Sequence, residues 1–242
     1  MYFLSVHDPQ AQTSEGPVHE VTLSPYLLSK YEMTQGQWVR LTGHNPSQFQ
    51  RVRFDTRWSR VKNPWSLLQP VEQVSWEDGM TATKRLGLAL PSEAQWERAC
   101  RAGSATAWWS GDEQELLHDV ANLKDDYAQK NGYEIWTYWE EWLDDGYTGP
   151  SRVGASRPNA FGLHEVHGNL WEACLDAHDS AFYARSPAID PVNRELDPFN
   201  RVHRGGSFLH LASYARSASR FFNKPDFPDR SLGLRPARGL TP

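Results

Sequence analysis

Hydrophobic and polar positions predict three short helices in the N-terminal part of the chain. In each, a Ser or Thr precedes apolar residues at helical spacing, and a glycine follows them. The helices are expected to follow Thr34 up to 43–46, to run from Ser75 or 77–78 to Leu86, and to follow Ser92 up to 102–103. Thr34 with Gln37, and Ser92 with Gln95, have the spacing of a capping box.

Short strands and long irregular loops are predicted for the rest of the chain. Strand-like segments lie at 18–23, 26–31, 70–76, 201–208 and 232–236, and 161–166 and 169–173 are short and apolar. Loops are expected at 44–69 (with Trp58 and 63–64), 105–158 and 176–197. A loop as long as 105–158 needs something to order it, such as packed rings or a metal ion. We find no repeat and no linker, so we expect a single domain over 1–242.

Composition excludes several functional classes. The net charge is -5, which gives no electrostatic case for nucleic acid or an anionic membrane as a partner. No apolar run approaches the roughly 20 residues that span a bilayer. The first ten residues lack the pattern of a signal peptide, so we expect a cytoplasmic or particle-associated protein. Cys100 and Cys174 give no disulfide framework or metal spacing, and we interpret both as small buried residues.

The segment 201–238 differs from everything before it. RGGSF at 204–208 and LGLRPAR at 232–238 look like a scaffold, whereas the residues between them have neither helical nor strand periodicity. An irregular, aromatic-rich segment between two ordered ends is typical of a binding surface on a rigid support. The arginines Arg204, Arg216, Arg220 and Arg235 are expected to form scaffold hydrogen bonds, as is Asp226.

Several stretches resemble the formylglycine-generating (sulfatase-modifying) enzyme family. They are EGPVHEVTLSPYLLSKYEMTQGQWV at 15–39, NPSQF at 45–49, PVEQVSWEDG at 70–79, LALPSEAQWERACRAG at 88–103, FGLHEVHGNLWEA at 161–173, RVHRGGSF at 201–208 and LGLRPAR at 232–238. The resemblance covers nearly the whole chain in order. It implies an α+β domain with a variant of the C-type lectin fold: few helices, short antiparallel strands and much irregular loop.

The residues that carry the family's chemistry do not match. The resemblance implies two cysteines in the last segment that hold copper through soft thiolates. This chain has Leu209, His210 and 213–215 in that region, without a cysteine. The iron-dependent sulfoxide synthases of the family need an additional N-terminal domain. We therefore expect neither copper nor iron, and we predict that the protein is not an enzyme.

The segment resembles instead the variable proteins of diversity-generating retroelements, which also use this fold. Adenine-directed mutagenesis of AAC codons there yields codons ending in C, which do not encode Trp, Met, Gln, Glu or Lys. Residues 209–231 contain no Trp, Met, Gln or Glu, although the chain has 11 Trp, and Lys224 would be an invariant position. The candidate variable positions are Leu209, His210, Leu211, Ser213, Tyr214, Ser219, Phe221, Phe222, Asn223, Phe227 and Ser231.

This reading predicts a protein that binds an unidentified protein or surface ligand through a diversified C-terminal segment. Rings at such positions supply contact area, and Ser and Asn supply adaptable hydrogen bonds. Two alternatives stay open: a family enzyme with altered chemistry, and an accessory domain whose aromatic face docks a permanent partner. His210 could act as a base only with a nucleophile and an orienting group, for which the sequence gives no placed partners.

Calcium is the cofactor that the resemblance implies, because hard cations take oxygen ligands from irregular loops. A first site would use Asn122, Leu123, Asp145 and Tyr147. A second would use His167, Gly168, Leu170 and Glu172 from the HGNLWE sequence at 167–172. The alternative for these residues is that Asn122 caps a turn, Asp145 is solvated and Glu172 pairs with an arginine.

Overall fold

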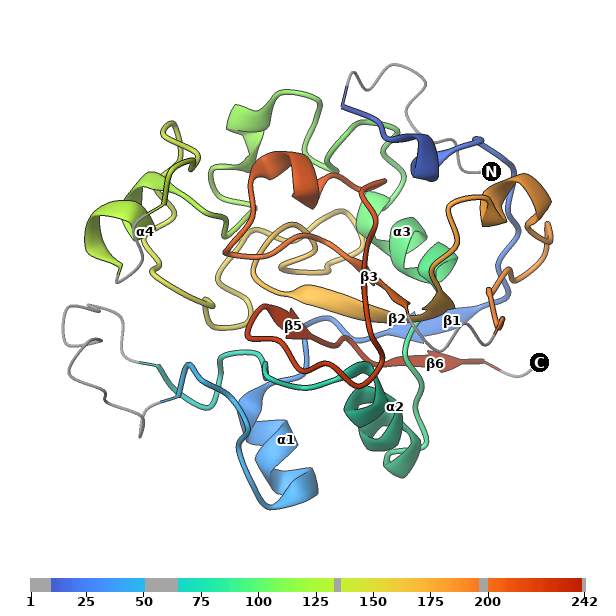
Figure 1. Ribbon diagram of the computed structural model, residues 1–242, viewed down its shortest axis with the longest axis horizontal. Coiled ribbons are helices and arrows are strands. Elements are labelled where there is room, and N and C mark those ends of the chain that lie inside the picture. The colour runs from blue at the N-terminus through green and yellow to red at the C-terminus, as the bar shows by residue number, and fades with distance from the viewer. Residues whose placement is uncertain (1–9, 51–64, 133–135, 196–199, 241–242) are drawn as a thin grey trace.

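A four-stranded sheet supports the C-terminal half of the chain (Figure 1). The computed structural model describes residues 10–50, 65–132, 136–195 and 200–240. The strand order is β4 (Phe221–Asn223), β3 (Arg201–Arg204), β2 (Trp171–Ala177) and β5 (Leu232–Gly233). The β4–β3 and β3–β2 pairs are antiparallel, whereas β2 and β5 are parallel. The short β4 strand forms one edge of this sheet.

A second sheet of two strands joins the two ends of the described chain. Strand β1 (Tyr26–Leu28) pairs antiparallel with β6 (Ala237–Gly239), with Leu27 opposite Arg238. Helices α1 (Gln35–Thr42) and α2 (Trp76–Arg85) lie on one side of the sheets, and α3 (Glu93–Arg101) lies on the other (Figure 1). The remaining helical elements are α4 (Asp126–Asn131) and the 3-10 turns η1 (Thr13–Glu15), η3 (Gln114–Leu117), η4 (Phe182–Arg185) and η5 (Ala212–Ala215).

All three predicted helices are present, and their N-termini are capped as the sequence indicates. The Thr34 and Ser92 side chains accept hydrogen bonds from the N3 backbone, and Gln37 and Gln95 return the bond to the cap residue. Ser75 forms a third capping box with Asp78. Each box satisfies backbone N–H groups that a helix terminus otherwise leaves without partners.

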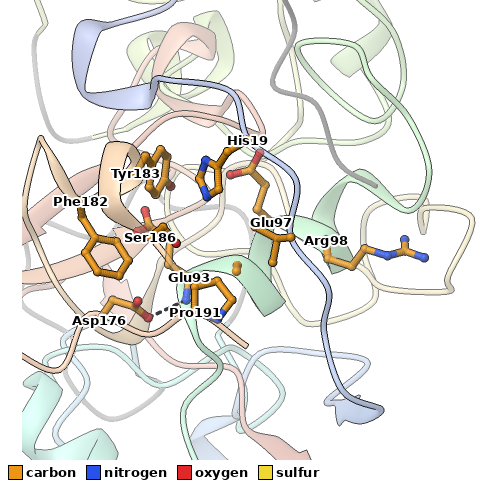
Figure 2. A pocket seen from close by; sticks show the side chains of 11 residues that line it. His19, Glu93, Glu97, Arg98, Asp176, Phe182, Tyr183, Ser186 and Pro191 are labelled. Carbon is orange, nitrogen blue, oxygen red and sulfur yellow. Dashed lines mark hydrogen bonds between the residues drawn. The ribbon is translucent and has the colours of Figure 1, made fainter. Parts of the chain in front are cut away.

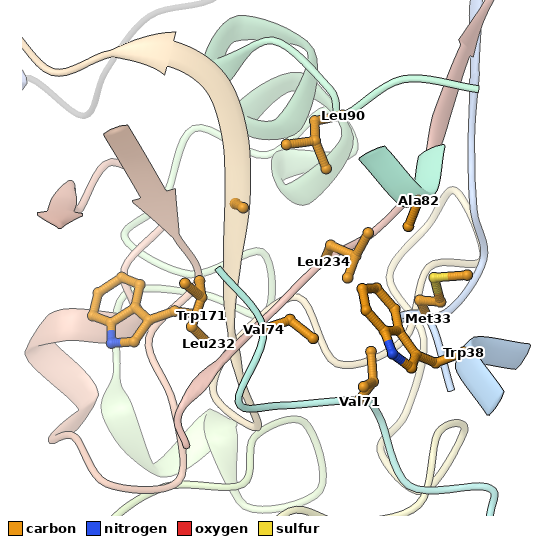
Figure 3. Close-up of a cluster of buried hydrophobic side chains, with 10 residues drawn as sticks. Met33, Trp38, Val71, Val74, Ala82, Leu90, Trp171, Leu232 and Leu234 are labelled. Atoms are coloured by element: carbon orange, nitrogen blue, oxygen red, sulfur yellow. The ribbon is translucent and has the colours of Figure 1, made fainter. Parts of the chain in front are cut away.

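The largest apolar cluster joins α1, α2 and the C-terminal strands (Figure 3). Trp38 of α1, Ala82 of α2 and Val71 pack with Leu234, close to β5. Trp171, at the start of β2, lies at the far end of the same cluster and is 1% exposed. The helices therefore buttress the strands that carry the segment 201–238.

Buried ion pairs attach the C-terminal segment to the rest of the molecule. Arg235 contacts the Glu172 carboxylate at 2.6–3.0 Å, and Arg220 contacts Glu93 at 2.7–2.9 Å. Arg216 pairs with Glu15, and Arg204 with Glu97. These contacts confirm the prediction that the four arginines belong to the scaffold. Each links the segment to a region distant in sequence.

Several predicted elements differ from the structure. Residues 18–23 form no strand; Thr22 makes only an isolated bridge to Ile189. The first strand ends at Leu28 rather than at Tyr31. The region 105–158, expected to be irregular, contains η3 and α4. The sheets are not wholly antiparallel, since β2 and β5 run parallel. Trp58 and 63–64, assigned to a loop, lie outside the described residues.

We predict that Arg235→Met strongly destabilises the fold. The substitution leaves the Glu172 carboxylate, which is 1% exposed, without its cationic partner. Removing one member of a buried ion pair typically costs about 3–5 kcal/mol. Urea unfolding of the variant measures this loss. Arg238→Met, at an exposed position three residues later, is the matched control and is expected to stay within about 0.5 kcal/mol. A loss below about 1 kcal/mol for Arg235→Met would contradict the prediction.

Candidate functional site

Exposed aromatic side chains gather on the C-terminal segment. Tyr214, Phe222 and Phe227 are 40%, 42% and 47% exposed, and Phe221 is 36% exposed. Four large rings exposed within 14 residues of sequence are more than scattered surface residues, which are normal. We define the aromatic surface as the nine candidate positions that are not buried: Leu209, His210, Leu211, Ser213, Tyr214, Phe221, Phe222, Asn223 and Phe227.

A buried tryptophan underlies the aromatic surface. The Phe221 ring stacks on the Trp171 ring with centroids 5.1 Å apart, and His210 meets the same indole edge-on at 5.3 Å. His210 also contacts the Tyr214 ring at 5.4 Å. Phe222 packs on His178 at 4.1 Å. These ring contacts join η5 and β4 into one continuous surface.

The backbone beneath the surface is held by the scaffold residues. Gly206 has φ +77, and a Cβ there would lie 2.9 Å from the Cα of Ala215, so only glycine fits this close approach. The Arg204 guanidinium donates to the carbonyls of Ser217, Ala218 and Ser219. It thereby satisfies consecutive carbonyl oxygens that an irregular chain would leave without partners.

Two of the predicted variable positions do not reach the surface. Ser219 is 2% exposed and lies among the carbonyls that Arg204 binds. Ser231 is 6% exposed, and its hydroxyl donates to Asp229. Neither side chain is therefore accessible to a ligand, and the assignment of these two positions to the binding surface is wrong. The expectation that the whole segment is irregular is also wrong, because it contains η5 and β4.

His210 is the titratable side chain closest to the centre of the aromatic surface. Burial lowers its pKa to about 4, so the imidazole is neutral at pH 7. Its Nδ1 lies 2.7 Å from the Ser207 hydroxyl, which is fully buried. If the Ser207 hydroxyl donates to Nδ1, the proton of the neutral imidazole is on Nε2, which can donate a hydrogen bond to a ligand. The buried Ser207 is inaccessible as a nucleophile in this arrangement.

Three residues of the first predicted calcium site are linked by hydrogen bonds, because the Asp145 carboxylate accepts from the backbone N–H groups of Leu123 and Tyr147. Asp145 Oδ2 accepts from the backbone N–H of Leu123, next to Asn122, whose buried Oδ1 has no hydrogen-bond partner among the described residues. Burial and the adjacent Asp125 carboxylate raise the pKa of Asp145 well above its ordinary value. Asp125 was not predicted, and burial raises its pKa to about 6. An amide oxygen without a partner, one residue before the N–H that Asp145 binds, is the kind of ligand that a hard cation takes.

The second predicted calcium site does not fit a cation. Both oxygens of Glu172 accept from Arg235, and Oε2 also accepts from the Trp96 indole at 2.7 Å. His167 lies between the Ala215 carbonyl and the Trp109 N–H. The Gly168 and Leu170 N–H groups bond to Gly205 and Glu32. Pairing with Arg235 removes Glu172, the only carboxylate of the predicted ligand set, from cation binding. The alternative, in which Glu172 pairs with an arginine, describes the structure. Among the described residues, no group of three or more His, Cys, Asp or Glu is arranged to hold a metal ion.

A small cavity of about 60 Å³ lies between α3 and η4 (Figure 2). Its wall includes Asp176, which accepts hydrogen bonds from the backbone of Glu93 and Asn193. Burial and the Glu93 carboxylate raise the pKa of Asp176 to about 7. Phe182 and Tyr183 form the facing aromatic wall (Figure 2). The cavity adjoins the Arg220–Glu93 ion pair and so belongs to the support of the aromatic surface.

Both cysteines lie in the core, away from the aromatic surface. Cys100 and Cys174 are fully buried in the same apolar cluster. Burial raises the pKa of the Cys100 thiol to about 12 and that of Cys174 well above its ordinary value. Buried thiols of high pKa are unreactive. These observations agree with the interpretation of both as small core residues.

The sheet order, helices and framed C-terminal segment define an α+β domain of the C-type lectin class found in formylglycine-generating enzymes. Residues 4–240 match the family model described as "Sulfatase-modifying factor enzyme 1-like domain", and the chain belongs to this family. The formylglycine-generating enzyme of Thermomonospora curvata is 30% identical over 275 residues, which cover 94% of this chain and 87% of that protein.

Solved structures confirm the fold. The structure of PvdO from Pseudomonas aeruginosa has a TM-score of 0.77 and 24% identity, covering 99% of this chain and 90% of its own. Treponema denticola variable protein 1 has a TM-score of 0.69 and 21% identity, covering 98% and 91%. In the described part of the chain, each helix is too short or too polar to cross a membrane.

The family assignment corrects one prediction from the sequence. We predicted that the protein is not an enzyme because the last segment lacks cysteines. Relatives about 30% identical over most of the chain are named as formylglycine-generating enzymes, so the chain belongs to an enzyme family. The absence of cysteines from the last segment concerns the copper site alone. It does not exclude the chain from the family.

We predict that Ca²⁺ stabilises the protein at the Asn122–Asp145 site. The folded-state pKa of Asp125, about 6, lies above the ordinary value near 3.9. The folded state therefore holds a proton that the unfolded state has lost, and the free energy of unfolding falls as pH rises from about 4 to about 6. When EDTA removes Ca²⁺, we expect the full fall in the free energy of unfolding between pH 4 and pH 6. Bound Ca²⁺ replaces the proton and contributes about 2.7 kcal/mol at 100 times its Kd.

Thermal unfolding with Ca²⁺ or EDTA at pH 5 and pH 7.5 measures this effect. Asp145→Asn is expected to abolish most of the rise in Tm that Ca²⁺ causes at pH 7.5. Asp144→Asn removes the same charge from the exposed neighbouring residue and is expected to keep that rise. A wild-type Tm that is equal in Ca²⁺ and EDTA at pH 7.5 would count against the site.

Proposed function

We propose that the aromatic surface binds a segment of another protein. The carrying observation is that Tyr214, Phe222 and Phe227 remain exposed on a backbone that buried ion pairs hold in place. Rigid aromatic side chains lose little conformational entropy on binding and give large contact areas. A surface that is already ordered also avoids the cost of ordering during association.

The edge strand β4 favours an extended ligand. Its inner edge pairs with β3, in the register Val202 opposite Phe222. Within the described residues, its outer edge pairs with no named strand. An extended peptide could add along this edge through backbone hydrogen bonds while the exposed rings contact alternate side chains. Such a ligand would be held by main-chain geometry and selected by the aromatic surface.

We infer further that the aromatic surface is diversified between related chains, as in the variable proteins of diversity-generating retroelements. The shared fold of Treponema denticola variable protein 1 supports this proposal, and so does the absence of Trp, Met, Gln and Glu over 209–231. Ser219 and Ser231 are excluded from the diversified set, because both are buried.

Calcium at the Asn122–Asp145 site would order the neighbouring loops and take no direct part in binding.

The coding region offers a direct test of diversification. We expect a reverse transcriptase gene close to this gene, together with a near-copy of the sequence encoding 201–238 that differs mainly at adenines. The differences are expected to fall on the codons of the aromatic surface and to leave those of Arg204, Arg216, Arg220 and Arg235 unchanged. Absence of the near-copy, or differences spread evenly over the segment, would reject diversification without rejecting binding.

Peptide binding can be tested with matched aromatic variants. Peptides selected from a displayed random library against the wild-type protein are expected to bind the aromatic surface. Phe222→Ala and Tyr214→Ala are expected to weaken their binding at least about tenfold, because truncating a central aromatic residue often costs about 2 kcal/mol.

Phe161→Ala and Tyr138→Ala serve as controls, since they remove rings of the same kind that are 51% and 74% exposed elsewhere. Both are expected to keep the wild-type affinity. The proposal fails if the selected peptides bind all four variants equally, or if the control variants lose binding as strongly as the other two. Circular dichroism confirms that each variant is folded.

A further inference from the structure

A groove of about 700 Å³ lies beside the β1–β6 sheet, away from the aromatic surface. Helix α1, the residues that directly follow α2, and strands β1 and β6 contribute its lining. The opposite end of α2 contacts the C-terminal segment, where the Glu77 N–H donates to the Pro225 carbonyl at 3.1 Å. Since α2 has 10 residues, it separates the groove from this contact by about 15 Å.

The walls of the groove are formed mainly by long aliphatic side chains. They are Leu27, Leu28, Met33, Leu41, Leu86 and Leu88. Leu27 is 56% exposed and Leu86 is 46% exposed, so the apolar lining is open to a ligand. The size is within the roughly 300–1,000 Å³ of small-molecule sites, which are also predominantly apolar with a few polar groups.

The charged side chains of the groove have a single sign. Arg40 of α1 and Arg238 of β6 are its two ionisable lining residues, and the Gln37 amide lies in the same lining. Both guanidinium groups are exposed, and neither forms an ion pair with any residue that the structure describes. The chain as a whole carries a net charge of -5. The groove is therefore locally cationic on an acidic protein.

We propose that this groove binds a free long-chain carboxylate, an acyl chain that ends in one carboxylate group. The aliphatic walls would remove the chain from water, and an arginine would hold the carboxylate through paired hydrogen bonds. A cationic amphiphile would be repelled by both arginines. A concave groove accepts one chain at a time, whereas a bilayer surface would require the apolar residues to protrude.

A fluorescent fatty acid, 11-(dansylamino)undecanoic acid, tests the proposal with the full chain. Its emission is expected to increase and shift to shorter wavelength on binding, and dodecanoate is expected to displace it. Dodecyltrimethylammonium, with the same chain length and the opposite charge, is expected to displace it at least about tenfold less effectively. Arg40→Gln, Arg238→Gln and Leu88→Gln are each expected to weaken binding several-fold.

Arg152→Gln is the matched control, because it removes the same charge from an exposed position outside the groove and is expected to bind as the wild type does. Equal displacement by the cationic and anionic amphiphiles would overturn the proposal. So would wild-type affinity in the double variant of Arg40 and Arg238. Binding to phosphatidylglycerol vesicles without binding of monomeric dodecanoate would also overturn it, because the ligand would then be a membrane surface.

Discussion

The fold depends on arginine side chains that reach from the C-terminal segment into carboxylates elsewhere in the chain. A buried charge is costly unless it is paired and its hydrogen bonds are satisfied. Arg235 meets this requirement with Glu172 and with the carbonyls of Ser29, Lys30 and His164. One side chain thereby ties β2, the β1 region and the last strands together. Regular secondary structure could not do this, because the strands involved are only two to seven residues long.

The same interactions explain how an irregular segment can be rigid. Between β3 and β4 most of the chain lies outside regular secondary structure, and Arg204 supplies donors to three consecutive carbonyls there. Arg216 reaches Glu15, and Arg220 reaches Glu93. The segment is thus held from below by residues whose side chains point away from the aromatic surface. The side chains of the aromatic surface therefore do not hold the backbone in place, apart from those that pack on Trp171 and His178.

Local signals in the sequence were sufficient for the helices and for the role of the arginines. Capping boxes depend on residues three positions apart, so Thr34 and Ser92 could be assigned without knowledge of the fold. Strands β4 and β6 were missed because their pairing comes from distant partners: β4 pairs with β3, and β6 with β1 and Ala89. Apolar and polar residues alternate in segment 18–23, which predicts a strand. The described part of the chain offers no neighbouring strand for it to pair with, so no strand forms. β propensity is decided by such context.

The candidate sites show the same division between local and distant information. The sequence paired Leu123 with Asp145, and the structure joins them through the Leu123 N–H, but whether they hold calcium stays a prediction. Asp125 was not included, because an Asp at the start of a helix is most simply explained as its N-cap. The second calcium site was wrong because Glu172 pairs with Arg235, and this partner lies 63 residues away in sequence. Ser219 and Ser231 were assigned by residue type, and only the three-dimensional structure shows that their hydroxyls point inward.

Family membership and local chemistry have to be weighed separately in this protein. The fold and the relatives place the chain in an enzyme family, while the region where the resemblance would put copper-binding thiolates contains His210, edge-on to the Trp171 ring, and no cysteine. Phe221 stacks on that same ring, so its identity is constrained more strongly than those of Tyr214 and Phe227. Loss of the Phe221 ring would uncover the Trp171 face and remove its packing partner. The proposed diversification would therefore be most restricted at Phe221 and His210, which pack on Trp171, and least restricted where side chains project into solvent.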